Sequence, residues 1–376
     1  MSFAKLPSEI IYKVGQIMAN DFHSMSSLCI ANKWTHQSLD TLLYRSVRLG
    51  SDNSVSSFCD TINSLKPHYS KYVVILQIGP DWRFDSEEGY RLQREFVPQI
   101  RRVLQSLVHL KHLSLSTTQN ASNDIFANLN VQFQLDTSVH YCGRLTDHML
   151  RFLEGQPSIT RLGCHASMTW ANNTLLSDTL KSKPNLFKSL KELESPACVA
   201  THIICARPVS NLTLIEPADL LYGSDNEIDS IIYSLTHAMV PITRLCITAD
   251  ARMGDLWTEF VRLLSQRCAP HNMKELRILI GFPLEIEERL ALEQVSKFTD
   301  LDSCSFLRFE ALDKFEIAQV VGGLRYNPPP SETISWLIRQ RMTHFSSWRK
   351  HNSMLRNVIL HGYVIPEMIY QESVLP

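Results

Sequence analysis

The chain has 376 residues, of which 44% are hydrophobic and 20% are charged, and its formal net charge is −1. This composition is ordinary for a folded globular protein and argues against disorder as the main state. The 37 basic residues balance 38 acidic ones. Since proteins that bind duplex DNA or RNA usually carry a basic excess, we expect no nucleic-acid partner.

Residues 6–18 predict a first short helix. Pro7 suits a first helical position, because its fixed φ angle fits a helix and its missing N–H would be unpaired there anyway. Ile10, Val14 and Ile17 recur at positions i, i+4 and i+7, which places them along one side of the helix. The segment therefore carries one wide apolar stripe.

Two more helical runs come next, at residues 25–34 and 36–47, and the chain then alternates like a strand over residues 43–49. Three helices this short bury few side chains between them. Such a unit needs a partner surface or an attached domain, so it is either a docking module or a cap on the rest of the chain.

The order and spacing of these residues resemble the F-box. The resemblance rests on Leu6-Pro7-x-Glu9-Ile10, then Val14 and Ile17, then Leu28 with Asn32-Lys33-Trp34. Residues 42–49 also resemble the segment with which the chain leaves the module in many fungal F-box proteins. The resemblance covers roughly the first 45 residues, with departures at Phe22–Met25 and at Gly15, which weakens the first helix.

In the F-box family the opening Leu-Pro and the apolar residues of the first helices bind a Skp-type adaptor, and through it a cullin. The resemblance therefore predicts an F-box over residues 1–45 and a substrate-binding domain over residues 46–376. The residues expected to bind the adaptor are Leu6, Pro7, Ile10, Ile11, Ile17, Leu28 and Trp34.

Beyond residue 72 short strands recur with the form apolar-x-x-apolar-x-apolar, separated by helical patterns. Their central residues are Leu76, Leu113, Leu162, Leu193, Leu212, Leu245, Leu276 and Val358, with a looser copy at Cys304, Leu307 and Phe309. Steps of 31 residues separate Leu162 from Leu193 and Leu276 from Leu307. A strand-plus-helix unit of this size predicts a solenoid.

Helical patterns at residues 226–239, 255–267, 286–298 and 331–350 complete this picture. The predicted fold class is α/β: three F-box helices followed by an irregular leucine-rich-repeat-like solenoid, with parallel strands on one face and helices on the other. The Asn that usually follows each strand of a leucine-rich repeat is absent, so an ordinary α/β domain stays open as an alternative.

In such a sheet, the side chains that alternate with the buried ones face outward and are candidates to bind a protein substrate. Arginine can hold a carboxylate with two parallel hydrogen bonds, and mixed charge gives selectivity. The candidates are Arg161, Glu192, Arg244, Glu275, Arg277 and Arg308.

Motifs for catalysis, nucleotides or metals are missing. The 9 cysteines include no Cys-x-x-Cys pair, and the nearest approaches to a metal or nucleophile site are Cys164-His165 and His202-x-x-Cys205. We expect no metal, no cofactor and no enzymatic activity. No signal peptide and no apolar stretch of about 18 residues is visible. Together with the free cysteines, this predicts a cytoplasmic or nuclear protein without membrane contact.

These patterns support two hypotheses. The first is a non-catalytic F-box subunit of a Skp–cullin–F-box ubiquitin ligase, which recruits an unknown protein substrate through its repeats. The second is a repeat scaffold without a ubiquitin-ligase role, whose first helices serve only as a cap.

Overall fold

The structure, a computed structural model, describes residues 6–18, 22–79, 91–141, 145–165, 173–215, 226–250, 254–267, 272–282, 309–321, 324–326, 335, 338, 345–349, 352–360 and 362–365. The chain divides into two compact units, one of Met1–Pro80 with Gly89–Ile159 and one of Asp81–Glu88 with Thr160–Pro376. The predicted boundary at residue 45 therefore falls inside the first unit.

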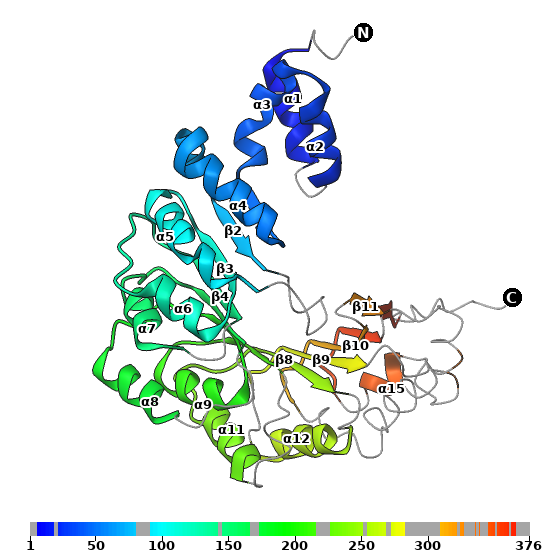
Figure 1. Cartoon of the computed structure of the whole chain (residues 1–376). Helices are drawn as coiled ribbons and strands as arrows, with labels where there is room; N and C mark the ends of the chain where they lie inside the picture. The colour runs from blue at the N-terminus through cyan, green and yellow to red at the C-terminus, as the bar shows by residue number, and fades with distance from the viewer. Residues whose placement is uncertain are drawn as a thin grey trace, which may run out of the picture. The chain divides into compact units, whose positions relative to one another are not determined.

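The first unit opens with three helices, α1 (Ser8–Ile17), α2 (Phe22–Ala31) and α3 (Lys33–Leu43), drawn in dark blue in Figure 1. They surround a small core of their own. It consists of Ile11, Met25, Cys29, Leu39 and Leu42, with Leu6, Tyr12, Leu28 and Leu43 packed against it. We call this group of helices the helical module.

Two local features shape the module. The Asn32 side chain caps α3 by accepting a hydrogen bond from the Thr35 N–H at 2.8 Å, so Trp34 belongs to α3 and not to the second helix as predicted.

Gly15 is buried, and a Cβ atom there would overlap the Cδ2 atom of Leu39. The glycine that weakens α1 as an isolated helix thus allows α1 to approach α3 closely.

A polar cluster joins the module to the next elements of the chain. Tyr69 donates a hydrogen bond to the Asp40 carboxylate at 2.8 Å and accepts one from the Lys66 ammonium at 3.1 Å. Its ring also contacts the Tyr44 ring, with centroids 4.2 Å apart. Burial raises the pKa of Tyr69, so its hydroxyl stays protonated and can donate to Asp40 at neutral pH.

The rest of the first unit alternates strands and helices. Its elements are β1 (Ser46–Leu49), α4 (Asp52–Asp60), η2 (Thr61–Leu65), η3 (Pro67–Tyr72), β2 (Ile75–Ile78), η4 (Arg94–Phe96), α5 (Val97–Ser106), β3 (His112–Ser116), α6 (Gln119–Phe126), β4 (Thr137–Tyr141) and α7 (Asp147–Glu154). The strands lie in the order β1-β2-β3-β4 and are parallel. Helices α5, α6 and α7 succeed one another along one side of them (Figure 1).

The second unit repeats this arrangement. Its elements are β5 (Arg161–Cys164), α8 (Asn173–Ser182), β6 (Glu192–Ser195), α9 (Ala197–Ala206), β7 (Asn211–Leu214), α11 (Asn226–Thr236), β8 (Arg244–Asp250), α12 (Gly254–Arg267), β9 (Glu275–Phe282), β10 (Lys314–Val321), β11 (Leu324–Tyr326), α15 (Phe345–Arg349), β12 (Asn357–Leu360) and β13 (Tyr363–Val364). Strands β5 to β10 and β12 are parallel neighbours in chain order, while β11 and β13 pair antiparallel with β10 and β12.

One backbone pattern opens strand after strand. At β6, the N–H groups of Lys191 and Glu192 both donate to the Thr160 carbonyl, at 2.8 and 3.0 Å. The residues that open β2, β3, β4, β7, β8, β9, β10 and β12 repeat this pair of hydrogen bonds, each time to the carbonyl of the residue just before the neighbouring parallel strand. The recurrence shows that a solenoid-like repeat is compatible with the chain even where its sequence is irregular.

The predicted elements are confirmed in large part. Each apolar strand pattern except the looser copy falls on a strand, and α11 and α12 match the helices predicted at residues 226–239 and 255–267. The looser copy is wrong where it can be checked, because Phe309 precedes β10 instead of ending a strand. Cys304, Leu307, the helix at 286–298 and most of that at 331–350 lie outside the described residues.

Strand β4 is a further difference, since no apolar pattern predicted it. Its two core-facing residues, Ser138 and His140, are polar, buried and 2.6 Å apart between Oγ and Nε2. This hydrogen bond gives each side chain one partner, while Nδ1 of His140 is buried without one. The strand therefore forms there with polar core residues and without an apolar signature.

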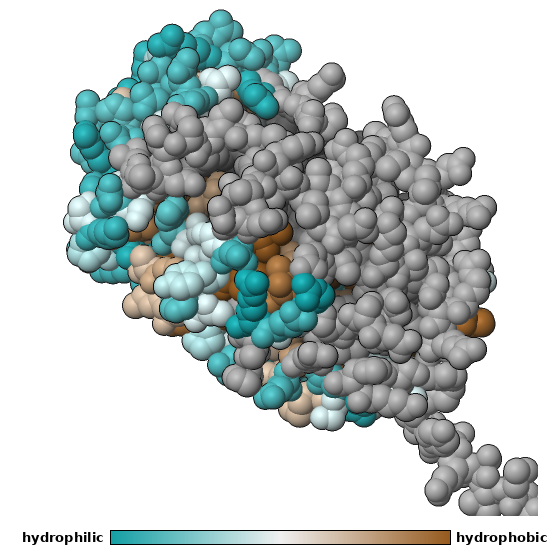
Figure 2. All heavy atoms as spheres, turned by 90° about the horizontal axis from the view of Figure 1, so that it is seen from below, coloured by the Kyte–Doolittle hydropathy of each residue, from teal (hydrophilic) through white to brown (hydrophobic). Residues whose placement is uncertain are grey.

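Hydrophilic residues cover most of the coloured surface in Figure 2, and hydrophobic residues gather near the middle of that view. The large apolar residues among those described are mainly in the core. The exceptions are therefore informative, because exposed clusters of large apolar side chains often mark binding surfaces.

Candidate functional site

Helix α1 has two apolar sides. Ile11 and Gly15 point into the core of the helical module and are buried. Ile10 and Ile17 are 44% and 84% exposed, and Val14, between them in the same i, i+4, i+7 series, is only half-buried. The stripe seen in the sequence is thus turned out of the module, where burial against a partner would contribute ~2 kcal/mol for Ile17 and roughly half of that for Ile10, which is less exposed.

Two further large apolar residues of the module are exposed. Trp34, at the start of α3, is 46% exposed, and Ile30, near the end of α2, is 82% exposed. Ile30 was not among the predicted binding residues, because the weak periodicity of the second run did not show which of its sides faced inward. We call Ile10, Ile17, Ile30 and Trp34 the apolar surface of the helical module.

The other residues predicted to bind an adaptor are placed differently. Ile11 is completely buried in the core of the module, so its predicted direct contact is corrected to a structural role. Leu6 and Leu28 are half-buried against the same core. Pro7 is exposed and precedes the first residue of α1.

The predicted charged residues of the second unit that the structure describes share one side of its strands. The strand register aligns Arg161 with Glu192, Arg244 with Glu275, and Glu275 with Lys314. A second row, two positions along each strand, aligns Arg277 with Glu316. The sequence could not show this alignment, because neighbouring strands are separated by segments of different length.

These side chains pair with one another. Arg277 contacts Glu316 at 2.9 Å and Glu275 at 3.3 Å, and Lys314 contacts the same two carboxylates at 3.4 and 3.0 Å. Arg244 lies 3.5 Å from Glu275 and is 64% exposed, whereas Glu316 is 4% exposed. This network fixes the orientation of its members, and a charged ligand would have to exchange with existing ion pairs.

A smaller group occupies β5 and β6. Arg161 contacts Glu192 at 3.8 Å and Glu194 at 3.4 Å, and His165 lies 3.4 Å from Glu194. The same alternation that places Glu192 on the outer side of its strand also predicts that Glu194 faces outward, but Glu194 is buried, at 7% exposure, whereas Glu192 is exposed. Arg308, the remaining predicted substrate contact, lies outside the described residues.

The Cys and His residues noted in the sequence do not converge on a metal site. His202 and Cys205 line a hollow of about 510 Å³ beside α9, together with Lys181. Burial and, to a smaller extent, the charge of Lys181 lower the pKa of His202. Among the described residues no three His, Cys, Asp or Glu side chains gather closely enough to hold a metal ion, and two ligands are too few for a structural zinc site.

Comparison with known protein families and with curated proteins finds no match for this chain. Within the described part of the chain, every helix is too short or too polar to cross a membrane.

Proposed function

We propose that this chain is a substrate-recruiting F-box subunit of a Skp–cullin–F-box ubiquitin ligase. The observation that supports the proposal best is the outward turn of Ile10 and Ile17 from a module that already has its own core. Large aliphatic side chains gain little by facing water, so this side of α1 suits a partner protein.

In this proposal the chain catalyses nothing itself. The helical module binds a Skp-type adaptor and through it a cullin, while the repeats hold the substrate. Holding both raises the local concentration of substrate near the transferring enzyme, which is the chain's contribution to the rate. The paired charges of β5 to β10 are the proposed contacts to a protein substrate, and the working compartment is the cytoplasm or the nucleus.

The proposal is tested by adaptor binding. Purified full-length protein is mixed with a purified Skp-type adaptor, and binding is measured by calorimetry. Ile17→Asp should weaken binding at least ten-fold, because a carboxylate would have to lose its water in an apolar interface. Leu65→Asp is the matched control, since Leu65 is also an exposed apolar residue of the first unit but lies outside the module.

Two results would refute the proposal: a wild-type chain that does not bind the adaptor, or an Ile10→Asp/Ile17→Asp double variant that binds it as tightly as wild type. Circular dichroism of each variant checks that the fold is kept.

The scaffold without a ligase role remains the second candidate, because the Asp40–Tyr69 hydrogen bond and the Tyr44–Tyr69 ring contact attach the module to the next elements as a cap would be attached. Deletion of residues 1–45 discriminates the two. A cap is needed for folding, so its loss should unfold the first strands. A docking module should be removable with loss of adaptor binding only.

A further inference from the structure

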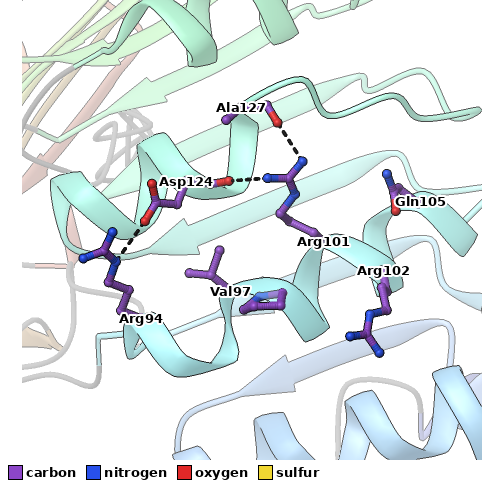
Figure 3. A pocket seen from close by; sticks show the side chains of 8 residues that line it. Arg94, Val97, Arg101, Arg102, Gln105, Asp124 and Ala127 are labelled. Atoms are coloured by element: carbon purple, nitrogen blue, oxygen red, sulfur yellow. Dashed lines mark hydrogen bonds and ion pairs between the residues drawn. The ribbon is translucent and has the colours of Figure 1, made fainter.

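A groove of about 490 Å³ lies between α5 and α6 of the first unit (Figure 3). Its lining contains three arginines, Arg94, Arg101 and Arg102, and a single carboxylate, Asp124, so the lining carries a formal charge of +2. This is a local excess of positive charge in a chain whose net charge is −1. Its size is within the range of ligand sites, about 300–1,000 Å³.

Arg101 is fixed in the groove. Its Nη1 donates to the Asp124 carbonyl at 2.9 Å and its Nη2 to the Ala127 carbonyl at 2.7 Å. The Asp124 carbonyl lies in the last turn of α6 and Ala127 is the residue that follows the helix, so neither carbonyl has a partner within it. A helix C-terminus supplies only about half an elementary negative charge, so the Arg101 guanidinium is held in place and only partly neutralised.

The groove already holds one carboxylate, at one end. Arg94 Nε donates to Asp124 Oδ2 at 3.0 Å. Figure 3 shows the Arg102 guanidinium pointing away from that of Arg101, with no dashed line to any neighbour. Among the described residues no acidic group pairs with Arg102, which is exposed. The Arg94 guanidinium is thus paired with an acid, that of Arg101 binds carbonyls, and that of Arg102 is available to a ligand.

The length of the groove indicates the size of the ligand. Arg94 and Gln105, at its two ends, lie about 17 Å apart along the helical axis at ~1.5 Å per residue. An extended peptide covers this distance with about five residues at ~3.3 Å each. Val97 contributes an apolar wall beside the charges, which suits a polypeptide better than a small inorganic ion.

We propose that this groove binds an acidic segment of a partner protein, about five residues long. One carboxylate of the segment binds Arg102, and another lies near Arg94 beside Asp124. The site is on α5 and the helical module's apolar surface is on α1 to α3, so the proposal does not depend on the F-box assignment.

The probe is a fluorescein-labelled pentaglutamate peptide, with pentaglutamine as the neutral reference, titrated with the full-length chain by fluorescence anisotropy at low salt. Pentaglutamate should bind and pentaglutamine should not, and added salt should weaken the binding. Arg102→Gln should weaken it roughly five-fold, while Asp124→Asn, which leaves Arg94 free, should tighten it roughly three-fold. Arg151→Gln is the matched control, an exposed arginine on α7 outside the groove.

A gain of affinity in Asp124→Asn cannot come from damage to the fold, so it separates a binding role from a structural one. The proposal is overturned if both peptides bind equally, if Arg102→Gln and Arg151→Gln have equal effects, or if Asp124→Asn binds no tighter than wild type. Tighter binding of a five-nucleotide single strand than of pentaglutamate would also overturn it, in favour of a nucleic acid.

Discussion

His140 should make the first unit less stable in mild acid. Its ring is 1% exposed, contacts the Phe126 ring edge-on with centroids 5.5 Å apart, and has the Ser138 hydroxyl as a hydrogen-bond partner. Burial lowers the pKa of His140 from 6.5 to about 3, because a charged imidazolium would lose its water without gaining a carboxylate.

The direction and size of this change in stability follow from how many protons the folded and unfolded chains bind. In the unfolded chain His140 takes up a proton below pH 6.5, whereas in the folded chain it stays neutral down to about pH 3. The unfolded state therefore binds more protons in this window, and stability is lost as the pH falls, by ~1.4 kcal/mol per unit once the pH is well below 6.5. Between pH 7 and pH 5 the loss is about 2 kcal/mol.

Hydrogen exchange followed by mass spectrometry can measure this loss in the first unit alone, from peptides that cover β3 and β4. The reference is His140→Gln, which can hydrogen-bond to Ser138 but does not titrate. At each pH the two proteins share the same intrinsic exchange rates and the same carboxylates, so these effects cancel. The reasoning is refuted if both proteins lose protection equally between pH 7 and pH 5.

Two further predictions concern the helical module. Gly15→Val should lower its stability by about 1–2 kcal/mol, because the new Cβ would overlap the buried Leu39 side chain and the better helix propensity of valine offsets only part of this cost; thermal unfolding by circular dichroism measures it. Tyr69→Phe should cost about 1 kcal/mol, because it removes the hydrogen bond to Asp40; protection of α3 amides from exchange measures it.

The Gly15→Val and Tyr69→Phe predictions each have a matched control in the first unit. A Cβ at Gly50 would meet no atom within 4 Å, so Gly50→Val should change stability little, and equal losses at both glycines would contradict the close-approach argument. Tyr72→Phe also removes a hydroxyl from η3. If it destabilises α3 as much as Tyr69→Phe does, the hydrogen bond to Asp40 is not the cause.

The sequence predicted the fold well where strands carry apolar residues at alternate positions. It failed at β4, where Ser138 and His140 occupy the core. It also failed at β10, where a chance apolar pattern that ends at Phe309 predicted a strand before the one that forms at Lys314–Val321. The regular step of 31 residues made that pattern look like a further repeat. Hydrophobic spacing alone cannot distinguish a strand from an apolar segment that packs just before one.

For the candidate site, helical periodicity placed Ile10 and Ile17 together, but it could not show that Ile11, one position on, faces the core instead. That distinction depends on where α3 lies against α1, which Gly15 and Leu39 determine. Likewise, the residue types on the strands suggested free charges, whereas the register between strands turns them into ion pairs.

The paired hydrogen bonds that open nine of the described strands use only main-chain atoms, so they do not depend on side-chain identity and depend little on the length of the segment between strands. The acceptor Lys191 and the donor Ser210 are 19 positions apart in the sequence, while the acceptor Asp313 and the donor Arg356 are 43 positions apart. The chain can therefore gain or lose connecting segments during evolution without disturbing adjacent turns.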